Sequence, residues 1–111
     1  MNTFIEIAKK EAKKSIMDQK HGCVIVYKGK YVISQGFNYH ISHYNHLWSI
    51  HAEIDAIKKT RKLKINLSSC DMYVVRISKI DESLRLSKPC DNCMKTIKEY
   101  KLRNIYYSVD I

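Results

Sequence analysis

Two short segments of the sequence carry side chains that together could bind a metal ion. The first spans residues 51–53 (His-Ala-Glu) and the second residues 89–93 (Pro-Cys-Asp-Asn-Cys). One imidazole and two thiolates form a typical ligand set for zinc, and three protein ligands on a tetrahedral ion leave one position open for chemistry. Glu53 supplies a carboxylate beside that position, where it could move a proton of a bound water. The residue types therefore indicate a catalytic metal site.

The spacing of these residues indicates how the two segments fold. Residues i and i+2 do not share a face inside a helix, so His51 and Glu53 can serve one ion only where a helix begins. Cys90 and Cys93 lie at i and i+3 after a proline, which suits the first turn of a second helix. We therefore expect two helices whose N-terminal ends point at one ion, where their dipoles favour thiolate over thiol.

The two segments resemble the signature of the cytidine deaminase superfamily, in which His-x-Glu is followed by Pro-Cys-x-x-Cys. The resemblance covers residues 23–108, and it is specific because both halves occur in the expected order. It implies one zinc ion per chain, held by His51, Cys90 and Cys93. It also implies hydrolytic deamination, in which Glu53 takes a proton from water and passes it to the ring nitrogen and the leaving amine, so that ammonia is released.

The same resemblance implies contacts to the substrate. Asn38 would hydrogen-bond the sugar, the backbone N–H of Ala52 would hold the carbonyl of the base, and the backbone carbonyl of Lys88 would accept from the departing amino group. Trp48 or Tyr44, just before the first metal helix, could stack on the base. The alternatives are a plain turn residue for Asn38 and core packing for Trp48.

For the substrate itself, the resemblance favours a cytosine base in a free nucleoside or nucleotide. Residues 22–26 (Gly-Cys-Val-Ile-Val) and 36–38 (Gly-Phe-Asn) are similar to the cytidine and deoxycytidylate deaminases of pyrimidine metabolism. One alternative is a base in RNA or single-stranded DNA, as in tRNA adenosine deaminases. Another is a zinc-stabilised binding module without catalysis, although such a module has no need of Glu53. The side chains of Arg85 and Lys88 could meet a phosphate or lie in solvent.

Composition narrows the class of protein. The 111 residues predict a single domain over 1–111, and the net charge of +9 indicates either a polyanionic or phosphorylated partner or a lysine-rich solvated surface. No apolar run approaches membrane-spanning length, and the first residues lack the apolar segment of a signal peptide. Cys23 and Cys70 fall outside the metal motif, so we expect buried thiols in a reducing, cytoplasmic compartment.

The apolar periodicity predicts the elements that position the motifs. They are a helix over 3–17, a hairpin of strands 23–27 and 31–35 with a turn at 28–30, a loop at 39–49, a helix over 51–62, a strand at 71–77, a polar connection at 78–88, a helix over 90–100 and a strand at 104–109. In the first helix, Thr3 and Glu6 form a capping box and Ile16 ends the apolar stripe. In the second, Asp55 is expected at the surface.

This order predicts an α/β fold: a three-layer α/β/α sandwich with a mixed sheet in which a β-hairpin is followed by βαβ units. The resemblance implies that this sandwich is of the cytidine deaminase type. Relative to the family, the usual C-terminal helix and strand are expected to be lacking, which leaves an open sheet edge and predicts a homo-oligomer. Three histidines of the 39–49 loop, His40, His43 and His46, could form a second metal site or lie free at the surface.

Overall fold

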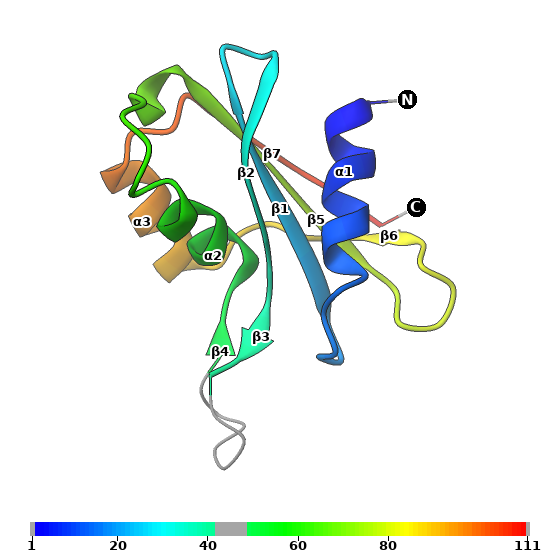
Figure 1. Cartoon of the computed structure of the whole chain (residues 1–111). Helices are drawn as coiled ribbons and strands as arrows, with labels where there is room; N and C mark the ends of the chain where they lie inside the picture. Colours follow the sequence, from blue (N-terminus) through cyan, green and yellow to red (C-terminus); the bar gives the residue numbers. More distant parts are fainter. Residues whose placement is uncertain (1, 42–48, 111) are drawn as a thin grey trace.

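A computed structural model describes residues 2–41 and 49–110 of the chain, which form a mixed sheet with helices on both faces (Figure 1). In chain order the elements are α1 (Thr3–Ala12), β1 (Lys20–Tyr27), β2 (Tyr31–Phe37), β3 (Tyr39–His40), β4 (Ser49–Ile50), α2 (Ala52–Lys59), the short 3₁₀ helix η1 (Leu67–Ser69), β5 (Cys70–Ile77), β6 (Leu84–Arg85), α3 (Asp91–Glu99) and β7 (Asn104–Tyr107). No helix in these two ranges is long and apolar enough to cross a membrane.

Strands β1 and β5 form the centre of the sheet. β1 pairs antiparallel with both β2 and β5, β7 pairs parallel with the first half of β5, and β6 pairs antiparallel with its end. The hairpin and the parallel β5–α3–β7 unit therefore confirm the predicted topology. Helix α1 covers one face and helices α2 and α3 cover the other, which confirms the three layers (Figure 1).

Alternating side chains of the central strands divide the core into two clusters, as expected for a sheet covered on both faces. Cys23 and Ile25 point towards α2 and α3, whereas Val24 points towards α1. Cys23 and Cys70 are buried free thiols, as predicted. The predicted metal residues His51 and Cys90 lie at the starts of α2 and α3, and these two helices cover the same face of the sheet. That face therefore carries the candidate site.

Helix α1 is shorter than predicted and is capped by a different residue. The side-chain oxygen of Asn2 accepts hydrogen bonds from the N–H groups of Phe4 (2.8 Å) and Ile5 (3.3 Å), so the predicted Thr3 capping box is wrong. After Ala12 the backbone closes tighter turns and leads into β1, because the chain must reverse to enter the sheet. Ile16 consequently lies outside the helix and is 87% exposed.

Two predicted connections contain short strands. Residues 39–40 and 49–50 pair as β3 and β4, so the expected loop is wrong at its two ends. The connection after β5 contains β6, which adds a strand beside the end of β5. Predictions for His43, Tyr44, His46 and Trp48 fall on residues outside the described ranges.

Candidate active site

Three predicted metal ligands meet where two helices begin. His51 is the N-cap of α2, Cys90 is the N-cap of α3, and Cys93 lies within the first turn of α3. The Nδ1 atom of His51 lies 3.1 Å from Sγ of Cys93 and 3.7 Å from Sγ of Cys90, and all three ligand atoms lie within 4.8 Å of one another. Tetrahedral zinc with its usual bond lengths holds nitrogen and sulfur about 3.6 Å apart. The spacing therefore fits one zinc ion.

The two N-cap residues leave the first backbone N–H groups of α2 and α3 without a side-chain capping partner. Neither His51 nor Cys90 makes a side-chain capping hydrogen bond, although both have the extended backbone typical of a cap. Common N-caps such as Ser or Asp would use their side chains to satisfy the first N–H groups. Here those N–H groups and both helix dipoles favour negative charge at the ligand sulfurs.

The charges of the donor set favour a cation at its centre. Burial raises the pKa of the Cys93 thiol, and the neighbouring Glu53 carboxylate and Cys90 raise it further. These effects hold the metal-free thiol protonated. A divalent cation between the donors reverses this balance and deprotonates a coordinating thiol. The residues present thus suit a metal ion in charge as well as in spacing.

Glu53 lies beside the three ligands and is 4% exposed. Burial raises the pKa of its carboxyl, although its own backbone N–H, the charge of His51 and a hydrogen bond with Cys93 oppose the rise. A raised pKa brings a carboxyl closer to neutrality, where it can both accept and return a proton. The structure therefore places a buried carboxyl with a raised pKa next to the predicted metal ligands.

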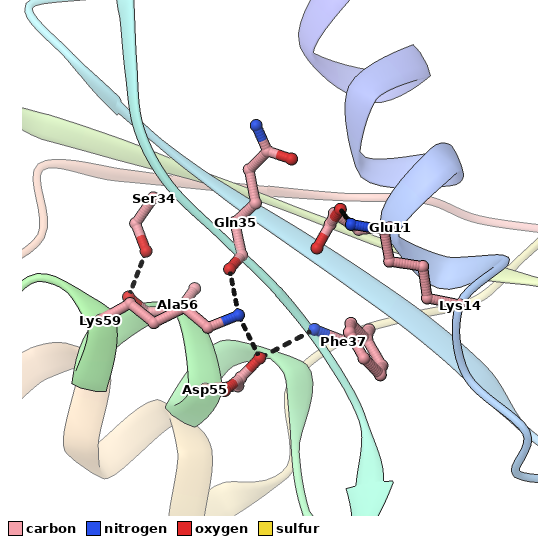
Figure 2. A network of polar contacts seen from close by, with 8 residues as sticks. All are labelled: Glu11, Lys14, Ser34, Gln35, Phe37, Asp55, Ala56 and Lys59. Atoms are coloured by element: carbon pink, nitrogen blue, oxygen red, sulfur yellow. Dashed lines mark hydrogen bonds and ion pairs between the residues drawn. The ribbon is translucent and has the colours of Figure 1, made fainter.

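A polar network fixes helix α2 against strand β2 (Figure 2). The Asp55 carboxylate is 3.2 Å from the backbone nitrogen of Phe37 and 3.0 Å from Nζ of Lys59, and the Ser34 hydroxyl donates to the carbonyl of Ala56 at 2.6 Å. Asp55 is only 6% exposed, so its predicted surface position is wrong. The carboxylate turns inward because it accepts a hydrogen bond from the N–H of Phe37, the last residue of β2. The network fixes the start of α2, and with it His51 and Glu53.

Gly36 allows helix α2 to approach this closely. A Cβ atom built on Gly36 would lie 2.6 Å from the carbonyl oxygen of Ala52 and 2.6 Å from the backbone nitrogen of Ala56. No side chain fits at these distances, so only glycine permits the contact. The motif residues of α2 therefore depend on a residue of β2 that carries no chemistry itself.

A cavity of about 640 Å³ opens beside the ligands. Its size lies within the range of small-molecule sites. Its lining includes four residues of the predicted site besides the ligands His51 and Cys90, namely Asn38, Ala52, Glu53 and Lys88. Trp48 lies outside the described residues, so its stacking role stays a prediction.

Asn38 is nearly buried and uses its side chain to hold the backbone. Its Oδ1 accepts from the N–H of His21 at 2.9 Å, and its Nδ2 donates to the carbonyl of Gln19 at 2.6 Å. These bonds fix the entry of β1 at the cavity. The proposed contact between Asn38 and a sugar stays a prediction.

Two further cavity residues, His21 and Arg76, lie on paired positions of β1 and β5. Burial, followed by the charges of Arg76 and His51, lowers the pKa of His21 to about 4, so its imidazole is neutral at neutral pH. No motif marks these residues. The available signal was a polar or charged side chain on the α2–α3 face of a strand whose other side chains on that face are mostly apolar.

The predicted second metal site receives no support from the described residues. His40 lines the cavity, whereas His43 and His46 lie outside the described ranges. Across residues 2–41 and 49–110, His51, Cys90 and Cys93 are the one group of three potential ligands.

Comparisons with solved structures show the same fold. The dCMP deaminase from the cyanophage S-TIM5 is 20% identical, with a TM-score of 0.74 over 96% of this chain and 84% of that one. A cytidine deaminase from Burkholderia pseudomallei is 18% identical, with a TM-score of 0.74 over 100% and 87%. Guanine deaminase from Bacillus subtilis is 24% identical, with a TM-score of 0.70 over 99% and 66%.

Sequence comparison gives the family. No curated protein matches the chain. The family model described as "cytidine and deoxycytidylate deaminase zinc-binding region" matches residues 1–109, which include all the ligands and Glu53. The chain therefore belongs to the cytidine and deoxycytidylate deaminase family, whose metal is zinc.

Proposed function

We propose that this protein is a zinc-dependent hydrolytic deaminase of a cytosine base in a free nucleoside or nucleotide. In this proposal His51, Cys90 and Cys93 hold the zinc ion and Glu53 moves the proton. The observation that carries it is the position of Glu53, which is buried, has a raised pKa and lies beside three metal-ligating atoms at the cavity. A purely structural zinc site has no use for such a carboxylate.

The chain's own residues suit each part of the reaction. Zinc, when bound, would supply a Lewis acid that lowers the pKa of a water towards neutrality. Glu53 would accept one proton from that water and give it to the ring nitrogen as the water oxygen bonds to the amino-bearing carbon. It would then carry the second proton, from the added hydroxyl, to the amine as the carbon–nitrogen bond breaks. The N–H of Ala52, at the start of α2, would bind the carbonyl of the base, and the carbonyl of Lys88 would orient the amino group. Ammonia leaves as the product.

The choice of cytosine is supported by likeness to particular deaminases. The cyanophage S-TIM5 dCMP deaminase, which has a TM-score of 0.73 to this chain, has been solved in complex with dCMP and dUMP. The similar structures also include a guanine deaminase and a diaminohydroxyphosphoribosylaminopyrimidine deaminase from Thermotoga maritima. The base must therefore be identified by experiment.

The test is ammonia release from a panel of substrates. The zinc-loaded protein is incubated with cytosine, adenine and guanine compounds, each supplied as nucleoside, nucleotide and short oligonucleotide. We expect turnover of the cytosine nucleoside or nucleotide. Turnover of guanine or adenine compounds alone would contradict the choice of base, and no turnover on the whole panel would favour a zinc-stabilised binding module.

A second candidate, a deaminase of bases in RNA or single-stranded DNA, is favoured by the net charge of +9. Part of that charge, on Lys58, Lys59 and Lys98, lies away from the cavity. Lysines of α2 and α3 gather at the C-terminal ends, about 12 Å of helix from the metal ligands. Salt distinguishes the two candidates, because binding of a polynucleotide weakens steeply with ionic strength and that of a free nucleotide much less.

A further inference from the structure

One side chain in the cavity carries a positive charge that the described protein leaves unpaired. Arg76 of β5 lines the cavity and is partly buried. Within residues 2–41 and 49–110 its guanidinium makes no ion pair and no side-chain hydrogen bond. A partly buried charge without a partner costs free energy. Such a group is therefore suited to an anion that arrives with the ligand.

The neighbours of Arg76 in the sheet do not neutralise it. His21 of β1 and Arg85 of β6 lie directly opposite Arg76 on the two adjacent strands, and neither is acidic. Like charges at such positions repel. Arg85 has a carboxylate nearby, since hydrogen bonds from Ser83 and, more weakly, the charge of Arg85 lower the pKa of Asp81. Arg76 itself makes no ion pair with any carboxylate of residues 2–41 and 49–110.

The carboxylates of the cavity are occupied elsewhere. Asp18 is 93% exposed and lies 3.2 Å from Nζ of Lys79, and Glu53 lies against Cys93 and His51. Lys88, a second cation of the lining, makes no ion pair within the described part of the chain. The cavity thus combines two unpaired cations with a proposed catalytic carboxylate.

We propose that Arg76, assisted by Lys88, binds a phosphate group of the substrate, so that the preferred substrate is a nucleoside monophosphate. This proposal rests on the proposed deaminase function. A guanidinium offers paired donors that match phosphate oxygens, and an ammonium adds a point charge. Two cations suffice for one phosphate. A polynucleotide requires a longer basic track with aromatic stacking partners, which this lining does not provide in the described residues.

The kinetic test compares deoxycytidine with dCMP, and cytidine with CMP. We expect the wild type to favour the monophosphates in kcat/KM by at least about tenfold. Arg76→Gln should lower kcat/KM for the monophosphates by about 10- to 100-fold, the effect of losing a charge-assisted hydrogen bond, and leave the nucleosides nearly unchanged. Arg85→Gln is the matched control, because Arg85 lies opposite Arg76 but does not line the cavity.

Several results would overturn the proposal. Equal kcat/KM for nucleoside and monophosphate in the wild type would show that phosphate is not recognised. Equal losses in Arg76→Gln and Arg85→Gln would show a general charge effect rather than a contact. A preference for a cytosine-containing oligonucleotide over the monophosphate, with a steep dependence on salt, would assign the phosphate to a polynucleotide backbone.

A binding measurement separates this proposal from the deaminase function. Calorimetric titration of the zinc-loaded wild type with dUMP and with deoxyuridine requires no turnover. We expect dUMP to bind at least about tenfold more tightly, and Arg76→Gln to remove that difference. Tighter binding of dUMP without ammonia release from any substrate would sink the deaminase function and leave the phosphate site standing. Equal binding of the two compounds would sink the phosphate site alone.

Discussion

At the scale of single residues, Glu53 is the group on which the proposed chemistry depends. Because Glu53→Gln keeps the size of the side chain and removes its basic oxygen, we predict that the variant retains zinc and loses at least ~100-fold in activity. Zinc content by atomic emission and ammonia release measure the two effects. Glu99→Gln, at an exposed position at the end of α3, serves as the control and should keep both properties. Near-normal turnover of Glu53→Gln would remove Glu53 from the mechanism.

His21 predicts a pH dependence of stability. Its pKa is about 4 in the folded protein, below the value of about 6.5 for an unfolded chain. Between these values the unfolded state binds more protons, so the free energy of unfolding falls as the pH drops from about 6.5 towards 4. We predict that His21→Gln flattens this part of the profile.

Urea denaturation of zinc-free wild type and variant at several pH values measures the slope, and the use of zinc-free protein removes any contribution from metal release. Parallel profiles for the two proteins would show that folding does not lower the pKa of His21.

The sequence allowed a prediction for residues whose type and spacing point to a chemical role. It gave no indication of residues whose role depends on their neighbours in the fold. The three predicted ligands and Glu53 stand out because residue type and spacing restrict what they can do, and the fold brings the three potential ligand atoms within 4.8 Å of one another. Asp55 was misplaced, because its inward turn depends on an N–H group of Phe37 that is distant in sequence. Arg76 could not be identified from the sequence, because only the fold shows which charged side chains have no ion-pair partner among the described residues.

At the scale of elements, two glycines of the sheet offer a matched test of how the site is positioned. A Cβ on Gly36 would meet the backbone of α2 at 2.6 Å, and a Cβ on Gly22 would meet the backbone of α1 at 2.0 Å. We predict that Gly36→Ala and Gly22→Ala both lower the free energy of unfolding, because each pushes a helix off the sheet. Only Gly36→Ala should weaken zinc binding, since α2 carries the predicted ligand His51 at its start and α1 carries no predicted ligand.

Competition with a zinc chelator, at temperatures where both variants are folded, measures the zinc affinity. A loss of affinity in Gly22→Ala as large as that in Gly36→Ala would indicate that the site responds to global stability and not to the position of α2.

The elements themselves were largely predictable, because the apolar periods of the central strands and helices reflect the layers that bury them. Errors arose at boundaries. Helix α1 ends at Ala12 and not near residue 17, because the chain must turn back into β1. The short strands β3, β4 and β6 were not predicted, because a segment of two residues shows no alternation of apolar and polar side chains.

At the scale of the whole molecule, the outer strand β7 predicts self-association. Tyr106, Tyr107 and Val109 on this edge are 45%, 39% and 58% exposed. Apolar side chains beside unpaired strand groups favour contact with another chain. We predict a dimer or larger homo-oligomer at micromolar concentration, measured by light scattering after gel filtration, and a smaller species for Val109→Lys. A monomeric wild type would contradict this prediction.

The unequal exposure of the four cysteines makes one of them a reporter. Cys23, Cys70 and Cys93 are buried, and Cys90 alone is exposed. An alkylating dye should therefore modify about one position per metal-free chain, and coordination of the Cys90 sulfur should block that labelling. The fraction of molecules carrying the dye then counts the empty sites in any preparation, independently of whether a substrate has been found.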